Sequence, residues 1–116
     1  MEPTIKKGQI IIVNKLQYLR SSPKRNDIVL IKPIEGIFEK GVWTHRIIAT
    51  EGDMVIISDG IVTTNDELVD FPEVHQDVNE KVEVPTGFVY QKGDNRKTIH
   101  GLVPIRAVQG KIIFSF

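Results

Sequence analysis

The chain has 116 residues, equal numbers of basic and acidic side chains (15 of each) and no cysteine. This length fits one domain, and zero net charge provides no bulk attraction for nucleic acid or an anionic membrane surface. The lack of cysteine excludes disulfides and thiolate metal sites. The sequence also has no run of about 18 apolar residues, the length a membrane-spanning helix needs.

Short apolar runs separated by turn residues dominate the sequence. Asp59-Gly60 separates two of these runs, and this pair supplies the positive φ angles of a tight hairpin turn. No run keeps a 3.6-residue period, so little helix is expected. The pattern predicts a mainly β fold of coiled antiparallel sheets, barrel-like, in a single domain covering residues 1–116. In chain order the expected strands cover 9–13, 27–32, 45–50, 54–58, 61–63, 88–91 and 107–114.

Residues 65–83 differ from the rest of the chain because they are acidic and polar (NDELVDFPEVHQDVNEKVE). Few of these side chains could be buried in a core. We therefore expect this segment to be a polar excursion away from the sheet.

Four segments carry motifs in a fixed order. They are residues 1–8 (MEPTIKKG), 26–29 (NDIV), 45–53 (HRIIATEGD) and 84–96 (VPTGFVYQKGDNR). They resemble, in order, the Ser-Met-x-Pro-Thr, Gly-Asp-Ile-Val, Lys-Arg-Val-Ile-Gly-x-Pro-Gly-Asp and Gly-Asp-Asn-Arg segments of the type I signal peptidases, serine peptidase family S26. Each motif alone is weak, but four in register across about 110 of the 116 residues make a specific signal.

The resemblance implies coiled β-sheets that enclose a serine–lysine dyad. The serine hydroxyl attacks the scissile carbonyl, and a lysine kept neutral by burial takes its proton. It also implies a place at the extracytoplasmic face of the cell membrane, reached through an N-terminal anchor that is not in this chain, and a polypeptide partner. No cofactor is implied, and the three histidines have no metal-ligand spacing.

The sequence departs from the family pattern at the residues that carry the chemistry. The nucleophile position lies immediately before Met1 and is absent from the sequence. His45 occupies the position of the base, and imidazole titrates near 6.5, so it needs no deep burial to be neutral.

The family places Ser-x-Asp-Ser-Arg after Gly-Asp-Asn-Arg to orient the base, but here KTIH and then Gly101 follow Arg96. Losing an orienting group costs orders of magnitude in triad enzymes. Thr98 and His100 are the candidates that could replace it.

Five further residues are assigned by the resemblance. Arg46 and Asp94 correspond to an ion pair with a structural role, the alternative being two unrelated surface charges. The other three, Met1, Pro3 and Thr4, correspond to the substrate groove beside the nucleophile, the alternative being a plain N-terminal turn.

Three functions fit these observations. The altered base and missing orienting segment favour a non-catalytic, chaperone-like accessory protein of pilus assembly in Gram-positive bacteria, which binds an extended pilin segment in the old substrate groove by strand addition. The second is an active, membrane-anchored signal peptidase that cleaves preproteins, with a serine preceding Met1 and His45 as general base. The third is an unrelated small β-barrel that binds another molecule. Five Phe, two Tyr and one Trp are few for a surface that stacks nucleic-acid bases, so no nucleic-acid partner is expected.

Overall fold

The computed structural model describes residues 1, 4–6, 8–19, 21–32, 43–70, 73–95 and 100–115. Strands dominate these residues, and the two helical elements, η1 and η2, are single turns of 3₁₀-helix. In chain order the elements are β1 (Ile11–Asn14), η1 (Gln17–Leu19), β2 (Ile28–Ile31), β3 (Trp43–Ala49), β4 (Met54–Ser58), β5 (Ile61–Thr64), β6 (Glu67–Leu68), β7 (Glu80–Glu83), β8 (Phe88–Lys92), β9 (His100–Pro104), η2 (Ile105–Ala107) and β10 (Val108–Ser115).

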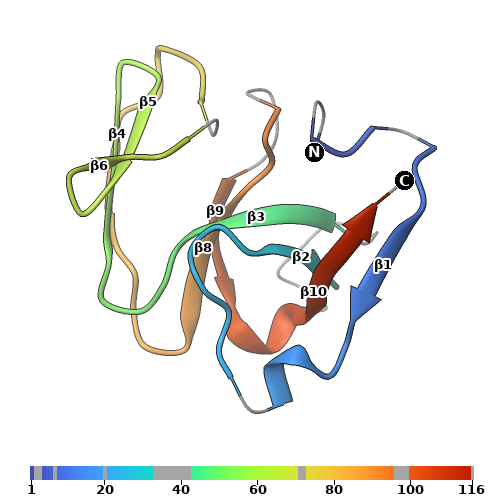
Figure 1. Cartoon of the computed structure of the whole chain (residues 1–116). Helices are drawn as coiled ribbons and strands as arrows, with labels where there is room; N and C mark the ends of the chain where they lie inside the picture. Colours follow the sequence, from blue (N-terminus) through green and yellow to red (C-terminus); the bar gives the residue numbers. More distant parts are fainter. Residues whose placement is uncertain are drawn as a thin grey trace.

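The strands form two antiparallel sheets. The larger sheet has the order β1-β10-β2-β3-β8-β9, and the smaller has the order β6-β5-β4-β7. Shifts in register interrupt the β1–β10, β10–β2 and β3–β8 pairs, and such irregularities bend a sheet locally. Figure 1 shows the smaller sheet as a lobe beside the coiled larger sheet. The predicted fold class, mainly β with coiled antiparallel sheets, is confirmed.

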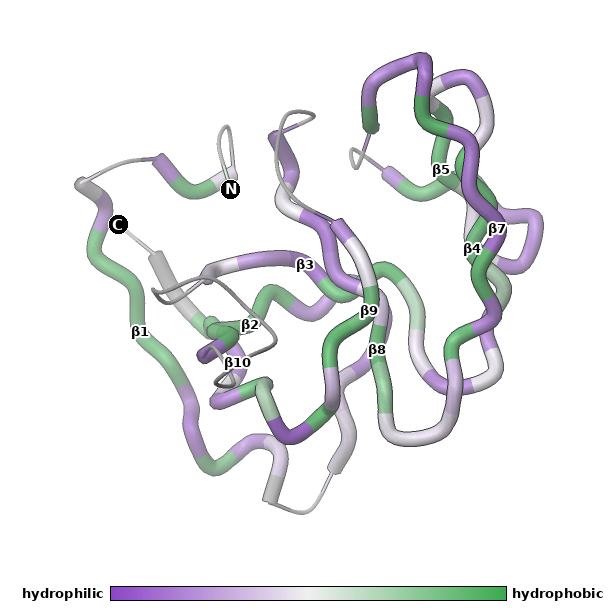
Figure 2. Tube along the Cα trace, turned by 180° about the vertical axis from the view of Figure 1, so that it is seen from behind, coloured by the Kyte–Doolittle hydropathy of each residue, from purple (hydrophilic) through white to green (hydrophobic). Residues whose placement is uncertain are grey.

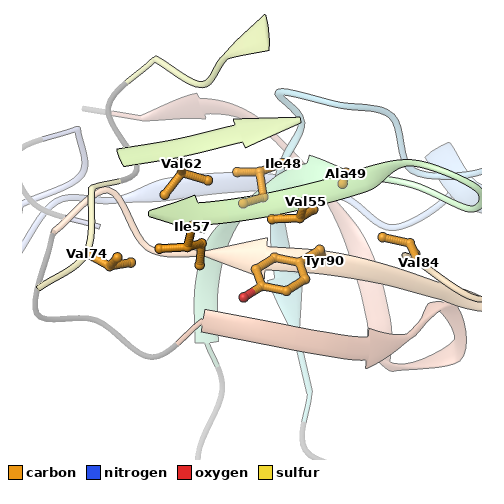
Figure 3. Close-up of a cluster of buried hydrophobic side chains, with 8 residues drawn as sticks. All are labelled: Ile48, Ala49, Val55, Ile57, Val62, Val74, Val84 and Tyr90. Atoms are coloured by element: carbon orange, nitrogen blue, oxygen red, sulfur yellow. The ribbon is translucent and has the colours of Figure 1, made fainter. Parts of the chain in front are cut away.

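Strands β3 and β8 contribute to both hydrophobic clusters. Ile47 and Val89 belong to the cluster of the larger sheet, while Ile48 and Tyr90, the next residue on each strand, belong to the cluster shared with the smaller sheet. Figure 3 shows the ring of Tyr90 among the valines and isoleucines of that shared cluster. Because successive side chains on a strand point to opposite faces, the β3–β8 pair forms a wall common to both cores.

From their composition we expected residues 65–83 to leave the sheet, but part of this segment is paired in the smaller sheet. They contain β6 and β7, and β7 pairs with β4 along its length. Figure 2 shows that β7 is mostly hydrophilic. It lies at the edge of the smaller sheet, where charged side chains are favoured and the backbone supplies the pairing. Composition alone therefore did not reveal this strand.

Turn residues at positive φ explain two of the sequence motifs. Asp59 and Gly60 have φ angles of 52° and 84°, so the predicted hairpin between β4 and β5 is confirmed. Asn26 has φ 75°, where the family motif has glycine. Asparagine tolerates this left-handed conformation better than most residues, so the turn before β2 is kept despite the substitution.

The hairpin glycine is also closely packed. A Cβ atom at Gly60 would lie 2.9 Å from the carbonyl oxygen of Val74, whereas a Cβ at Gly52, which has nearly the same φ, would contact nothing within 4 Å. We expect Gly60→Ala to lower the free energy of unfolding by about 1–3 kcal/mol more than Gly52→Ala, because only the first adds overpacking to the shared backbone strain. Urea unfolding of both variants measures this, and equal losses would contradict the close contact.

Candidate functional site

Strand β3 places His45 in a buried position. The side chain is 6% exposed, and its ring stacks on Trp43, two residues earlier on the same face, with centroids 5.6 Å apart and an interplanar angle of 27°. On the other side, Nδ1 of His45 is hydrogen bonded to Oε1 of Gln91 on β8. The stacked ring of Trp43 therefore fixes the plane of the imidazole, and the amide of Gln91 fixes the direction in which Nδ1 points.

The electrostatic surroundings keep His45 neutral. Burial lowers the pKa of His45 below its ordinary value, and this outweighs the hydrogen bond to Gln91, which acts in the opposite direction. The positive charges of the Met1 amino group and Lys92 also lower the pKa, while Asp94 raises it. A neutral imidazole has a lone pair on one ring nitrogen and can accept a proton, as a general base must.

On the opposite face of β3, Arg46 forms a bidentate ion pair with Asp94. Nε donates to Oδ1 at 2.8 Å and Nη2 donates to Oδ2 at 2.7 Å. The Asp94 side chain is fully buried. Burial alone would raise the pKa of Asp94, but hydrogen bonds from Arg46 and Thr4 and the guanidinium charge outweigh it and hold the pKa below its usual value.

Asp94 also binds the first residues of the chain. The Thr4 hydroxyl donates a hydrogen bond to Oδ2 of Asp94, and the Asp94 backbone N–H lies 3.3 Å from the sulfur of Met1. The Met1 amino group is close enough to lower the pKa of both His45 and Asp94. One cluster thus brings together segments that are more than 40 residues apart in sequence.

The structure places most of the site residues predicted from sequence in this cluster. Met1, Thr4 and Arg46 each contact Asp94, and His45 lies on the other face of β3 within electrostatic range of Met1. The Thr4 hydroxyl is engaged by Asp94. Pro3 lies outside the described residues.

Lys92 is a buried residue that the sequence analysis did not single out. It is 0% exposed, and its ammonium group donates to the carbonyl oxygens of Gly93 at 2.8 Å and Asn95 at 2.7 Å. Burial lowers the pKa of Lys92 to about 8, against the opposing effect of the Asp94 charge. Lys92 therefore fastens the turn that carries Asp94.

Gln91 was missed for the same reason as Lys92. Both polar residues end an apolar strand, directly before Gly93-Asp94, and polar residues at a strand end usually suggest solvent. The signal that could have found them is their place inside the fourth motif, between Phe-Val-Tyr and Gly-Asp.

His100, a candidate for the missing orienting group, takes part in a different cluster. Its Nδ1 lies 2.7 Å from the hydroxyl of Tyr90 and 3.7 Å from a carboxylate oxygen of Glu80. His100 pairs with Lys92 across β8 and β9, so it lies on the face opposite Gln91. Thr98, the other candidate, lies outside the described residues. The structure thus gives His100 the role of joining the two sheets.

In the described part of the chain, no group of three or more His, Asp or Glu side chains could hold a metal ion. No helix among these residues has the length and apolar character needed to cross a bilayer.

A scan against protein families matches residues 1–116 to the family described as "Signal peptidase, peptidase S26". The chain belongs to this signal peptidase family. Among curated relatives, it is 31% identical over 132 residues to thylakoidal processing peptidase 1, chloroplastic, of Arabidopsis thaliana, covering all of this chain and 39% of the relative. It is 28% identical over 138 residues to signal peptidase I of Bacillus caldolyticus, covering all of this chain and 74% of that protein.

The fold agrees with the family assignment. A crystal structure of a signal peptidase I from Enterococcus faecalis superimposes with a TM-score of 0.60 at 20% identity, over 78% of this chain and 97% of the other. The chain spans well under half the length of the Arabidopsis relatives.

The buried ammonium gives the first testable consequence of the site. Because the pKa of Lys92 is about 8 in the folded state and about 10.4 in an unfolded chain, the unfolded state binds more protons between these values, and stability rises with pH through this window. Tyr18 and Tyr90 have raised pKa values, and their contribution to the free energy of unfolding is lost only above about pH 10. Between pH 8 and pH 10, therefore, the change in stability reports on Lys92.

We expect the free energy of unfolding of the wild type to rise, relative to Lys92→Met, by about 1 kcal/mol from pH 8 to pH 10. Denaturant unfolding at several pH values measures this. Lys81→Met, which removes an exposed lysine of β7, is the matched control. A wild type and a Lys92→Met variant with the same pH slope would show that the ammonium group is not buried.

Proposed function

We propose that this domain, in its full-length polypeptide, is a serine endopeptidase of the signal peptidase type that uses His45 as general base. The nucleophile is a serine immediately before Met1, the position at which the family motif has serine. The observation that carries the proposal is the state of His45, which is buried, neutral and fixed by Trp43 and Gln91, within electrostatic range of Met1.

The reaction follows from these groups. The serine hydroxyl oxygen attacks the scissile carbonyl carbon, and the free ring nitrogen of His45, Nε2, takes the hydroxyl proton. When the tetrahedral intermediate collapses, the same nitrogen gives its proton to the leaving amine, and an acyl-enzyme remains. Water then repeats the two steps, with His45 again accepting and returning the proton, and releases the new carboxyl terminus.

The ion pair supports this chemistry by fixing position. Arg46 is the neighbour of His45 on β3, and through Asp94 it is linked to Thr4 and Met1. The base and the segment adjoining the nucleophile are therefore held by one buried carboxylate. Small errors in such placement cost large factors in rate, so a rigid link of this kind favours catalysis.

The proposed substrates are preprotein polypeptides at the extracytoplasmic face of a membrane. Exposed apolar side chains support this place: Ile10 is 61%, Ile12 44% and Ile113 55% exposed, and the last two lie on the paired strands β1 and β10. Exposed apolar side chains at this edge suit contact with a bilayer surface. The N-terminal anchor is part of this proposal.

The second candidate is a non-catalytic protein that binds an extended peptide. The connection between Asn95 and β9 favours it, because it has only four residues, 96–99, and does not contain the Ser-x-Asp-Ser-Arg segment of the family. A role in pilus assembly, with a pilin segment as ligand, remains a prediction that no contact in the structure tests.

Two versions of the protein distinguish these candidates, one carrying serine immediately before Met1 and one carrying alanine there. We expect the serine version to cleave a preprotein peptide after a small residue, and the alanine version to be inactive. Adding His45→Ala to the serine version should lower kcat/KM by about 100-fold or more, because general base catalysis is lost. Mass spectrometry of the products measures cleavage and its position.

Circular dichroism of each version confirms that the fold is kept. If the folded serine version binds the peptide but does not cut it, the catalytic proposal fails and the peptide-binding candidate replaces it. Cleavage that survives His45→Ala would exclude His45 as the base.

A further inference from the structure

Gln91 is a polar side chain in an apolar environment. It is 2% exposed and lies on the same face of β8 as Val89, a member of the hydrophobic cluster of the larger sheet. Burying an amide without a hydrogen-bond partner is unfavourable. The described partner of Gln91 is His45, which reaches it from the neighbouring strand.

The register of the two strands explains this contact. Ile47 of β3 lies opposite Gln91 of β8, so His45, two residues earlier, lies on the same face and diagonal to Gln91. Trp43, two residues earlier again, covers the imidazole. The contact is thus built by strand pairing and does not depend on a flexible loop.

We propose that Gln91 is the positioning residue of His45, which fixes the neutral imidazole in the tautomer with the proton on Nδ1 and the lone pair on Nε2. The amide oxygen of glutamine can only accept a hydrogen bond, so the Nδ1 atom that it contacts must donate one. The catalytic meaning of this tautomer rests on the proposed function, whereas the tautomer itself does not.

An amide differs from the usual carboxylate partner of a catalytic histidine. A carboxylate orients the ring and also stabilises its protonated form, which raises the pKa of the ring. The amide orients the ring without adding charge, and burial then dominates. The charged side chains that act on His45 among the described residues are Lys92 on β8 and Asp94 after it, while β2 places the apolar Val29 opposite. The Met1 amino group also lowers the pKa, but it becomes an uncharged amide when a serine precedes it. The base therefore stays unprotonated to lower pH than it would beside a carboxylate.

In this proposal Gln91 takes the place of the orienting segment of the family, which this sequence lacks. The family segment that orients the base follows Gly-Asp-Asn-Arg, and in this chain the orienting contact comes from the residue two positions before Gly93. The site thus keeps an oriented base although the connection to β9 is shortened.

Nitrogen-15 NMR of the chain with labelled histidines tests the tautomer without any need for activity. At neutral pH we expect the His45 ring to carry its proton on Nδ1, with His45→Asn used to assign its signals. Gln91→Leu should abolish this preference, because leucine offers no acceptor. Gln91→Glu should keep the tautomer and raise the pKa of His45 by about one pH unit or more, because it adds a negative charge.

His100 is the internal control, since it lies on the other face and is held by Tyr90. Its unchanged signals would show that each variant is folded. A wild-type His45 with its proton on Nε2 would overturn the proposal, and so would a folded Gln91→Glu variant whose His45 titrates as in the wild type.

The serine version of the protein separates this inference from the proposed function. There Gln91→Leu should lower kcat by about 10-fold or more with little change in KM, and Gln91→Glu should move the acidic limb of the kcat profile to higher pH. A correct tautomer in an inactive serine version would refute the proposed function alone. Cleavage by a serine version whose His45 has the other tautomer would refute the inference alone.

Discussion

The buried carboxylate of Asp94 is the group on which the arrangement of the site depends. Isolated in a protein interior it would be strongly unfavourable, and two donors from Arg46 and one from Thr4 offset that cost. These donors come from β3 and from the first residues of the chain. The charge therefore requires two distant segments to meet, and the position of the N-terminal segment follows from that requirement.

Because successive side chains on β3 and β8 point to opposite faces, the proposed base and the ion pair that supports it lie on different sides of these strands. His45 and Gln91 face one side of this pair, and Arg46 and Lys92 face the other. Adjacent residues such as His45 and Arg46 thus have different roles, because one supplies the proposed base and the other binds the carboxylate of Asp94. A slip of one residue in this pairing would exchange the faces and destroy both arrangements.

The three charges close to one another on the scaffold side partly balance. Arg46 and Lys92 are opposite each other on the paired strands, and the negative charge of Asp94 raises the pKa of both. The ammonium group of Lys92 donates hydrogen bonds to backbone carbonyls of the turn. These bonds explain why a buried cation is tolerated without a direct ion pair to a carboxylate. The result is a rigid turn after β8, and this turn sets the direction of Asp94.

Local chemistry made part of this structure predictable. The Asp59-Gly60 turn predicts the β4–β5 hairpin, and the order of the motifs in the sequence singles out His45, Arg46 and Asp94. The strands β6, β7 and β9 were missed, because charged residues, glycine and proline are poor strand formers and all three are edge strands whose pairing comes from the backbone. Gln91 was missed since its burial depends on the pairing of β8 with β3, which no local pattern records.

The contact between Met1 and Asp94 gives the most direct test of the account. The chain has two methionines, Met1 and Met54, so selective methyl labelling yields two well-separated probes. We expect nuclear Overhauser effects between the Met1 methyl group and the Asp94 amide, whose nitrogen lies 3.3 Å from the Met1 sulfur, and none between Asp94 and the Met54 methyl group. A narrow Met1 signal without contacts to Asp94 would show that the N-terminal segment lies elsewhere, and the site described above would then not exist.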